Sequence, residues 1–89
     1  MTREISGVQD PTIRYARSKG WLCWKMQIEG RNGCPDYWCF KAGVLFIIEF
    51  KAPGKPRRKQ QELRAEELEK RGFVVHVIDN LDAGRALFD

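Results

Sequence analysis

The stretch GCPDYWCFKAGVLFIIEFKAPG, from Gly33 to Gly54, places two carboxylates and a lysine around the most apolar segment of the chain. Side chains alternate between the two faces of a strand, so Glu49 and Lys51 are expected to point the same way while Phe50 points into the opposite layer. Both charges then emerge at the end of a buried strand. A tight turn before that strand brings Asp36 close to Glu49 or Phe50 in an antiparallel hairpin.

Hydrophobic periodicity and turn residues on either side of this stretch predict an α/β fold, a mixed sheet flanked by helices in the order α-β-β-β-α-β-α. The expected elements are a helix 8–19, strands 21–28, 36–40 and 44–50, a helix 57–71, a strand 73–78 and a short helix to Leu87. Three successive strands predict a meander, and the helix before the fourth strand predicts a parallel crossover. The first helix either has Asp10 as its N-cap, followed by Pro11, or begins near Ser6. Asp79 or Asn80 caps the last helix.

Length and composition predict one domain, spanning residues 1–89, with a net charge of +4. A domain of this size is marginal alone, so self-association is expected, and the positive charge favours a polyanionic partner. No apolar run approaches the ~20 residues of a membrane span, and the first residues have no apolar core typical of a secretory signal. Three cysteines without a C-x-x-C spacing, and His76 as the single histidine, argue against a disulfide framework or structural zinc. We expect reduced thiols and a core histidine.

The three charged residues around the apolar strand are chemically suited to one another. Two neighbouring carboxylates, Asp36 and Glu49, repel, and a hard cation such as Mg²⁺ removes that conflict. A bound cation acidifies water and neutralises charge on a phosphate oxygen, while a nearby Lys51 orients the water. This set predicts metal-assisted hydrolysis of a phosphodiester. The same spacing equally suits a salt bridge between Glu49 and Lys51 at the strand end, with Asp36 as a turn residue.

Two short motifs carry a resemblance to a known family. CPD at 34–36, followed by EFK at 49–51, resembles the signature of the PD-(D/E)XK nucleases. The surrounding residues narrow this to the virus-type replication-repair nuclease (VRR-NUC) family, which the chain resembles from about Glu4 to Leu87. The segments that carry the match are GRNGCPDYWCF, VLFIIEFKAPGKP, a glutamine in the next helix and GFVVHVIDN.

The resemblance implies a restriction-endonuclease-like fold and a Mg²⁺- or Mn²⁺-dependent endonuclease that acts on branched DNA in DNA repair. Stand-alone members are similar to Holliday-junction resolvases, which work as homodimers on a four-way junction. They are typically phage or bacterial proteins, so the resemblance also implies the cytoplasm of a bacterial host. A nuclease acting on flapped or linear duplex DNA is the alternative within the same fold.

The resemblance also assigns roles to individual residues. It implies that Asp36 and Glu49 are metal ligands, with the backbone carbonyl of Phe50, and that Lys51 positions and activates the attacking water. Gln61 matches the helical glutamine of the family better than Gln60, and its amide would contact the water or a phosphate. The alternative for Gln61 is an ordinary residue on a helix surface.

One position departs from the family pattern. The family usually carries a glutamate on its first helix that completes the metal site, and the best alignment places Gln9 there, with Glu4 as the other candidate. A glutamine amide offers a cation an oxygen but no charge, so metal binding is expected to weaken. The chain is therefore either a nuclease, an inactive variant of one, or a catalytically silent DNA-binding module.

A basic cluster precedes and begins the second long helix, and it consists of Lys55, Arg57, Arg58 and Lys59. A phosphate at this helix start would be favoured by both the helix dipole and these side chains. Arg31 and Arg14 would extend the surface. Such contacts predict salt-dependent affinity rather than base specificity. The alternative is a solvated basic loop. For Trp21, Trp24 and Trp38, a place in the core or a dimer interface is favoured over base stacking.

Overall fold

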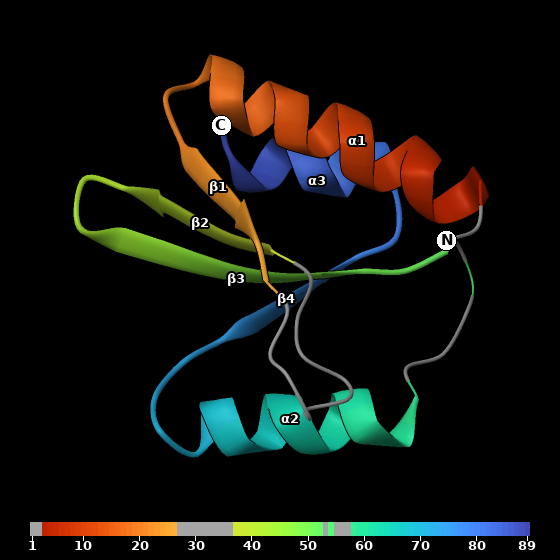
Figure 1. Cartoon of the computed structure of the whole chain (residues 1–89), viewed down its shortest axis with the longest axis vertical. Helices are drawn as coiled ribbons and strands as arrows, with labels where there is room; N and C mark the ends of the chain where they lie inside the picture. Colours follow the sequence, from red (N-terminus) through yellow and green to blue (C-terminus); the bar gives the residue numbers. More distant parts are fainter. Residues whose placement is uncertain (1–2, 27–36, 53, 55–57) are drawn as a thin grey trace.

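The computed structural model describes residues 3–26, 37–52, 54 and 58–89, with the backbone alone for residues 3–6. Its elements are α1 (Arg3–Ser18), β1 (Leu22–Lys25), β2 (Tyr37–Lys41), β3 (Val44–Phe50), α2 (Lys59–Glu69), β4 (Val75–Ile78) and α3 (Leu81–Leu87) (Figure 1). This succession confirms the predicted order α-β-β-β-α-β-α. Over these ranges, the chain has no helix with the length and apolar character that crossing a membrane requires.

The four strands form one mixed sheet in the order β1-β2-β3-β4. The first three strands are an antiparallel meander, and β4 pairs with β3 in parallel after the chain passes through α2. Both features confirm the predicted topology. A two-residue turn joins β2 to β3, and its residues Ala42 and Gly43 both have positive φ, 51° and 79°. Positive φ at both central positions matches the right-handed twist of a hairpin, although Asn or Gly is preferred where Ala42 lies.

Helices cover β3 on both faces, with α1 and α3 on one side of the sheet and α2 on the other (Figure 1). The larger apolar cluster, on the α1–α3 side, has the buried members Val8, Ile13, Ala16, Cys23, Cys39, Ile48, Phe50, Ile78 and Phe88. The smaller cluster, on the α2 side, is built on Ile47, Ala65 and Val75. Alternate residues of β3 therefore enter different clusters, which explains why its sequence is apolar without interruption up to Glu49.

The start of α1 contradicts one of the two predictions and supports the other. The helix begins at Arg3 and continues through Pro11, so Asp10 is not its N-cap, whereas an early start with Pro11 inside the helix is what the alternative near Ser6 predicts. A proline in a helix interior costs about 3 kcal/mol because it lacks an N–H and crowds the preceding turn. Packing of the buried side of α1 against the sheet and α3 offsets this cost. Thr12 lies in that contact, so close to Gly84 of α3 that a Cβ at Gly84 would lie 2.8 Å from the Thr12 methyl carbon.

The other elements confirm their predicted type, with shifted ends. β1 covers Leu22–Lys25 of the predicted strand 21–28, of which residues 27–28 lie outside the described part. The helix predicted over 57–71 spans Lys59–Glu69, and the strand predicted over 73–78 begins at Val75. Asn80 rather than Asp79 is the N-cap of α3, because its Oδ1 accepts a hydrogen bond of 2.8 Å from the Ala83 N–H. Strand ends are set by the partner strand, which local sequence does not specify.

The sulfur and imidazole groups occupy structural positions. Cys23 and Cys39 lie opposite one another on β1 and β2, and both are buried and free of disulfides. Burial raises the pKa of the Cys39 thiol, which keeps it protonated and unreactive. His76 is half-buried on β4, edge-on to Phe46 with ring centroids 5.2 Å apart, and burial lowers its pKa. Cys34 lies outside the described residues.

Candidate active site

Two charged side chains are buried at the carboxyl end of β3. Glu49 is 1% exposed and Lys51, just past the end of the strand, is 8% exposed. The Lys51 N–H donates a 3.0 Å hydrogen bond to the Ile78 carbonyl, so pairing with β4 extends one residue beyond β3. Alternation along the strand then places Glu49 and Lys51 on the α2 side, together with Ile47. This arrangement is the one that the spacing E-x-K predicts.

The Lys51 side chain is held by α2. Its Nζ donates a 3.2 Å hydrogen bond to Oε1 of Gln61. The same oxygen accepts a 2.9 Å hydrogen bond from the backbone N–H of Arg58, the N-cap residue of α2. Gln61 thus forms the glutamine half of a capping box; an arginine side chain has no acceptor with which to form the other half. The sequence pattern places Gln61 near the site, but it does not predict this direct contact with Lys51.

The start of α1 lies toward the same side of the molecule as the end of β3 and the start of α2 (Figure 1). Gln9, the position at which the family usually carries glutamate, is buried, with 4% of its surface exposed. It follows Val8 on the side of α1 that packs into the larger cluster. The backbone of Glu4 is part of the first turns of α1, but its side chain is not among those that the structure describes. A buried polar side chain at position 9 therefore sits on the layer opposite to that of Gln61.

Asp36, the second predicted carboxylate of the site, lies outside the described residues. Its neighbour Tyr37 begins β2 and lies opposite Ile48, so the start of β2 is beside the end of β3. Tyr37 packs edge-on against Phe50, with ring centroids 5.9 Å apart. Burial raises the pKa of Tyr37, and the charge of Arg17 opposes that effect. The pairing of the start of β2 with the end of β3 is the geometry that the predicted hairpin requires.

Asp79 is an acidic residue that the sequence suggested only as a helix cap. Ile78 pairs with Phe50, so Asp79 follows β4 at the edge where Lys51 follows β3. Its side chain is half-buried and accepts a 3.0 Å hydrogen bond from the Asn80 amide. The signal that points to it is topological: carboxyl ends of parallel strands meet at one edge of a sheet.

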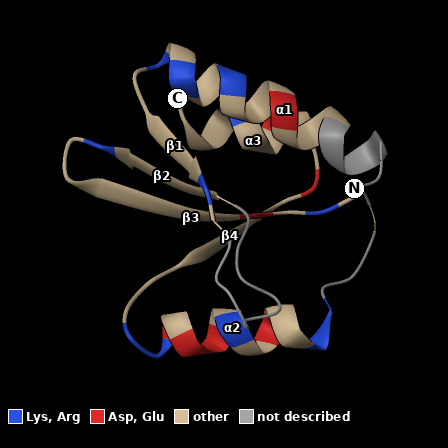
Figure 2. Cartoon of the chain, in the orientation of Figure 1, with Lys and Arg blue, Asp and Glu red and all other residues tan. Residues whose placement is uncertain are grey.

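The predicted DNA-contact residues are divided between two faces. Arg58 and Lys59 are exposed at the start of α2, next to the residue that holds Lys51, while Arg14 is exposed on α1 across the sheet (Figure 2). Lys55, Arg57 and Arg31 lie outside the described residues. The start of α2 therefore keeps the basic character that the sequence predicts.

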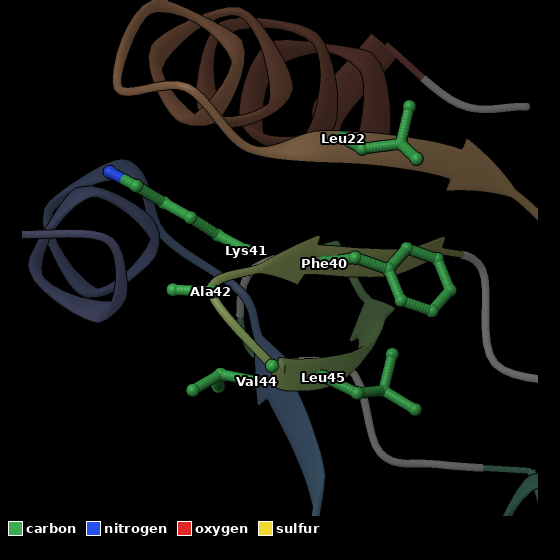
Figure 3. Close-up of a pocket in the computed structure, with 7 residues that line it drawn as sticks. Leu22, Phe40, Lys41, Ala42, Val44 and Leu45 are labelled. Carbon is green, nitrogen blue, oxygen red and sulfur yellow. The ribbon is translucent and has the colours of Figure 1, made fainter.

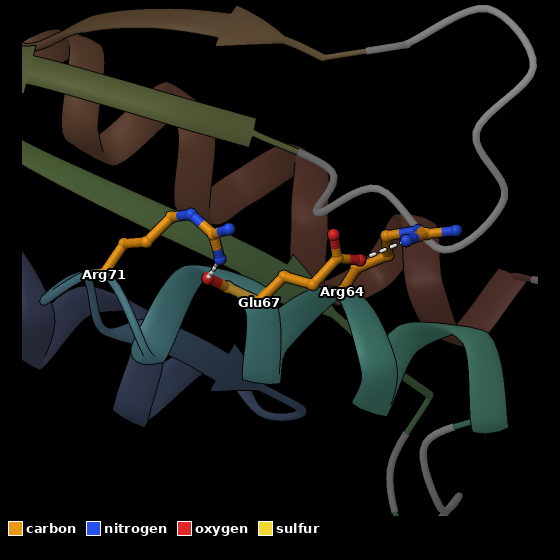
Figure 4. A network of polar contacts seen from close by, with 3 residues as sticks. All are labelled: Arg64, Glu67 and Arg71. Carbon is orange, nitrogen blue, oxygen red and sulfur yellow. Dashed lines mark hydrogen bonds and ion pairs between the residues drawn. The ribbon is translucent and has the colours of Figure 1, made fainter.

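Further along and just beyond α2, two basic side chains contact Glu67. Figure 4 shows Arg64 and Arg71 on either side of Glu67. Arg64 forms an ion pair with the Glu67 carboxylate, and Arg71 donates a 2.7 Å hydrogen bond to the Glu67 carbonyl. These contacts give the two arginines a structural role on the helix surface. Arg58 and Lys59, at the beginning of α2, are exposed and close to the residue that holds Lys51.

The fold has a close counterpart among solved structures. A structure of a VRR_NUC domain is 27% identical in sequence, and the match covers 89% of this chain and 91% of that chain with a TM-score of 0.76. No family model and no curated protein matches the sequence. The structural match confirms the predicted PD-(D/E)XK-like α/β fold. Together with the charged residues at the end of β3, it supports a nuclease-type domain that is similar to the VRR_NUC domain.

Proposed function

We propose that this chain is a divalent-metal-dependent endonuclease that hydrolyses branched DNA in the manner of a Holliday-junction resolvase. The observation that carries the proposal is the buried ammonium of Lys51, held by Gln61 and separated by one residue from the buried carboxylate of Glu49. Burying such charges is costly, and apolar residues would serve stability as well or better. Charges kept in place at this cost support a reaction centre rather than a structural salt bridge.

The proposed ligands suit a hard cation. Glu49, Asp36, the Phe50 carbonyl and the Gln9 amide all offer oxygen, the donor that Mg²⁺ and Mn²⁺ prefer. Within the described ranges no group of three His, Cys, Asp or Glu residues could hold a metal ion. The proposal therefore needs Asp36 and backbone oxygen as well as Glu49. A cation bound there would acidify a water molecule and neutralise charge on a phosphate oxygen.

Lys51 acts on the water and the phosphate. Its ammonium orients the attacking water and stabilises the negative charge that develops on the phosphate oxygens. The water oxygen loses a proton and forms a new bond to phosphorus, while the bond from phosphorus to one sugar oxygen breaks and that oxygen takes up a proton. One DNA end then carries the phosphate, and the other carries the hydroxyl. Because Lys51 is buried and held by Gln61, its ammonium enters the reaction in a fixed position.

DNA is held mainly through its phosphates. Arg58 and Lys59 are exposed at the start of α2, next to the residue that holds Lys51. In this proposal Lys55, Arg57 and Arg31, which the sequence places near the site, would add further phosphate contacts, and Arg14 would contact DNA from the other side of the sheet. These contacts carry affinity and a steep salt dependence, whereas shape selects the branched substrate. We place this activity in the cytoplasm of a bacterial or phage-infected cell.

A second function follows from Gln9. A buried amide at this position supplies no charge to a metal, which favours an inactive variant or a DNA-binding module of the same fold. The deciding experiment is cleavage of a labelled four-way junction with Mg²⁺ or Mn²⁺ by this chain and by Gln9→Glu. We expect Gln9→Glu to bind the metal more tightly and to cleave about 10 times faster or more, because even changes in the groups that support metal ligands commonly alter metal affinity or activity about 10- to 100-fold.

The junction assay also separates the alternatives. Cleavage by both forms at the same rate would show that Gln9 is not a ligand position. Binding without cleavage by either form, on junction, flap and linear duplex, supports the DNA-binding module. Faster cleavage of flaps or linear duplex than of the junction supports the other nuclease class.

We also propose that the chain works as a homodimer, joined at the hairpin end of the sheet. β1 is a short edge strand, and its residues Leu22 and Trp24 are each 53% exposed on the face that α2 leaves uncovered. Trp24 packs edge-on against Phe40, with ring centroids 5.0 Å apart, and Phe40 lines an apolar hollow of about 400 Å³ (Figure 3). The same surface thus offers a projecting ring and a recess, which two copies related by a twofold axis can exchange.

A further inference from the structure

One oxygen atom joins the end of β3 to the start of α2. Gln61 Oε1 accepts hydrogen bonds from Lys51 Nζ at 3.2 Å and from the Arg58 N–H at 2.9 Å. An amide oxygen has two lone pairs and can accept both at once. Because both neighbours are donors, the oxygen of this amide must face them rather than its NH₂ group. The Gln61 Oε1 atom therefore already accepts hydrogen bonds from two groups of the protein itself.

The contact restricts a side chain that is otherwise flexible. Lysine has a long stem with many rotamers, and a buried ammonium is costly unless it is hydrogen-bonded. Gln61 supplies an acceptor without a negative charge. The ammonium is thereby oriented, while its positive charge is left available for a phosphate or a water molecule. A carboxylate at the same place would have formed an ion pair and offset that charge.

The second hydrogen bond restricts Gln61 itself. The Arg58 N–H is one of the donors at a helix start that lack an intrahelical partner, and the Gln61 side chain satisfies it from position N3. The amide is thus fixed by the helix that carries it. Since Lys51 is fixed by that amide, the position of its ammonium depends on the start of α2.

We infer that Gln61 is a positioning residue for Lys51, acting through the lysine ammonium rather than by touching water or phosphate itself. This inference rests on the proposed nuclease function and extends it. It gives Gln61 a different task from the one that the family resemblance implies. It also predicts that losing the Gln61 oxygen lowers the rate of cleavage and leaves DNA affinity in place.

The contact can be tested first without metal or DNA. In ¹H–¹⁵N spectra of the metal-free protein, a buried and hydrogen-bonded Lys51 ammonium gives a signal that exchanges slowly with water. We expect Gln61→Ala to shift or broaden this signal beyond detection and Gln61→Glu, which keeps an acceptor oxygen, to retain it. Gln60→Ala is the matched control, because Gln60 is the exposed neighbour on the same helix. Backbone amide signals report in the same spectra whether each variant is folded.

The catalytic consequence is tested by single-turnover cleavage of the four-way junction, in whichever form cleaves, this chain or Gln9→Glu. A misplaced ammonium lowers the rate constant about 10- to 100-fold in Gln61→Ala, since displacement by about 1 Å has effects of this size. The dissociation constant for DNA should change by less than a factor of about 2, because the exposed cations that carry affinity are unaltered. Gln61→Glu should recover part of the rate, and Gln60→Ala should cleave like its parent.

Three results would overturn the inference. An unchanged Lys51 signal in Gln61→Ala shows that the hydrogen bond does not hold the ammonium. An equal loss of DNA affinity and cleavage rate shows that Gln61 touches the DNA directly. Absence of cleavage in every form refutes the nuclease function, and with it any catalytic role of Gln61, while the spectra alone still decide whether Gln61 holds Lys51.

Discussion

The two ends of β3 depart from the usual distribution of residues in opposite directions. At the hairpin end, apolar side chains are exposed: Val44 of β3 is 46% exposed, and Leu22 of β1, in the same meander, is 53% exposed. At the other end charges are buried, with Glu49 1% and Lys51 8% exposed. One strand thus exposes what proteins usually bury and, about six residues later, buries what they usually expose.

The energetic weight of the two departures is different. An exposed apolar side chain costs little, and isolated ones are common on protein surfaces. A buried charge must give up its hydration, which costs several kcal/mol per ion before any partner returns part of it. The charged end is therefore the stronger sign of function, and the apolar end acquires meaning from its shape, a projecting ring beside a hollow. Variants at each end test this ranking.

The largest effect is expected from Lys51→Met, which keeps the aliphatic stem and removes the ammonium. Loss of one charged group that stabilises a transition state typically lowers a rate about 10²- to 10³-fold, so cleavage of the four-way junction should fall by that factor. DNA affinity should change by less than about threefold, since exposed cations supply it.

Arg58→Glu with Lys59→Glu is the contrasting variant. These residues are exposed, so the double change should weaken DNA binding first and leave the single-turnover rate at saturating protein nearly unchanged. Cleavage and binding are measured separately, by single-turnover kinetics and by fluorescence anisotropy. Equal losses of affinity and rate in Lys51→Met would contradict a catalytic role for the buried end of β3.

The second effect concerns the apolar end. Trp24→Lys places a charge where the proposed twofold contact buries a ring, so the dimer dissociation constant should rise about tenfold or more, as expected for a central aromatic residue. Leu63→Lys on α2 is the control, since Leu63 is similarly exposed, at 45%, but lies away from the hairpin. Sedimentation velocity measures both. If Leu63→Lys weakens association and Trp24→Lys does not, the dimer uses α2 instead of the hairpin end.

The two ends also differ in how far the sequence predicts them. E-x-K at the end of an apolar run predicts two charges on one face, and Glu49 and Lys51 are both buried at the end of β3. The bond from Lys51 to Gln61 depends on where α2 lies, and that position is set by packing of Ala65 on Ile47, which local pattern does not reveal. The sequence is equally unable to predict that this face of β1 is exposed. Leu22 and Trp24 alternate as core residues do, and only the extent of α2 leaves them uncovered.

Local chemistry misled at one further place for a related reason. Asp10–Pro11 has the form of a helix start, yet the helix runs through it because burial of Val8 and Ile13 offsets the cost of an internal proline. Position 9 is read from the family pattern, and the structure adds that Gln9 is buried there without deciding its role. Local sequence patterns therefore predict the structure well along β3, whose residues alternate between two layers. They predict it less well at the start of α1, where tertiary packing overrides the local helix signals.

The smallest effect is expected in the turn at the apolar end. Ala42 adopts a φ of 51°, in a region where a left-handed backbone costs an L-residue about 1–2 kcal/mol, and asparagine tolerates it better. Ala42→Asn should therefore raise the free energy of unfolding by about 1 kcal/mol, measured by urea denaturation, and Gly43→Ala should lower it by a similar amount. Destabilisation by Ala42→Asn would rule out this turn conformation.

The same variant also tests the dimer, because Ala42 lines the hollow. If Ala42→Asn stabilises the monomer but weakens its association, the strained alanine is retained for the contact surface. If association is unchanged, the backbone strain at Ala42 has no role in the dimer. The two ends of β3 would then differ in function, because the charged end forms a reaction centre while the apolar end is only exposed surface.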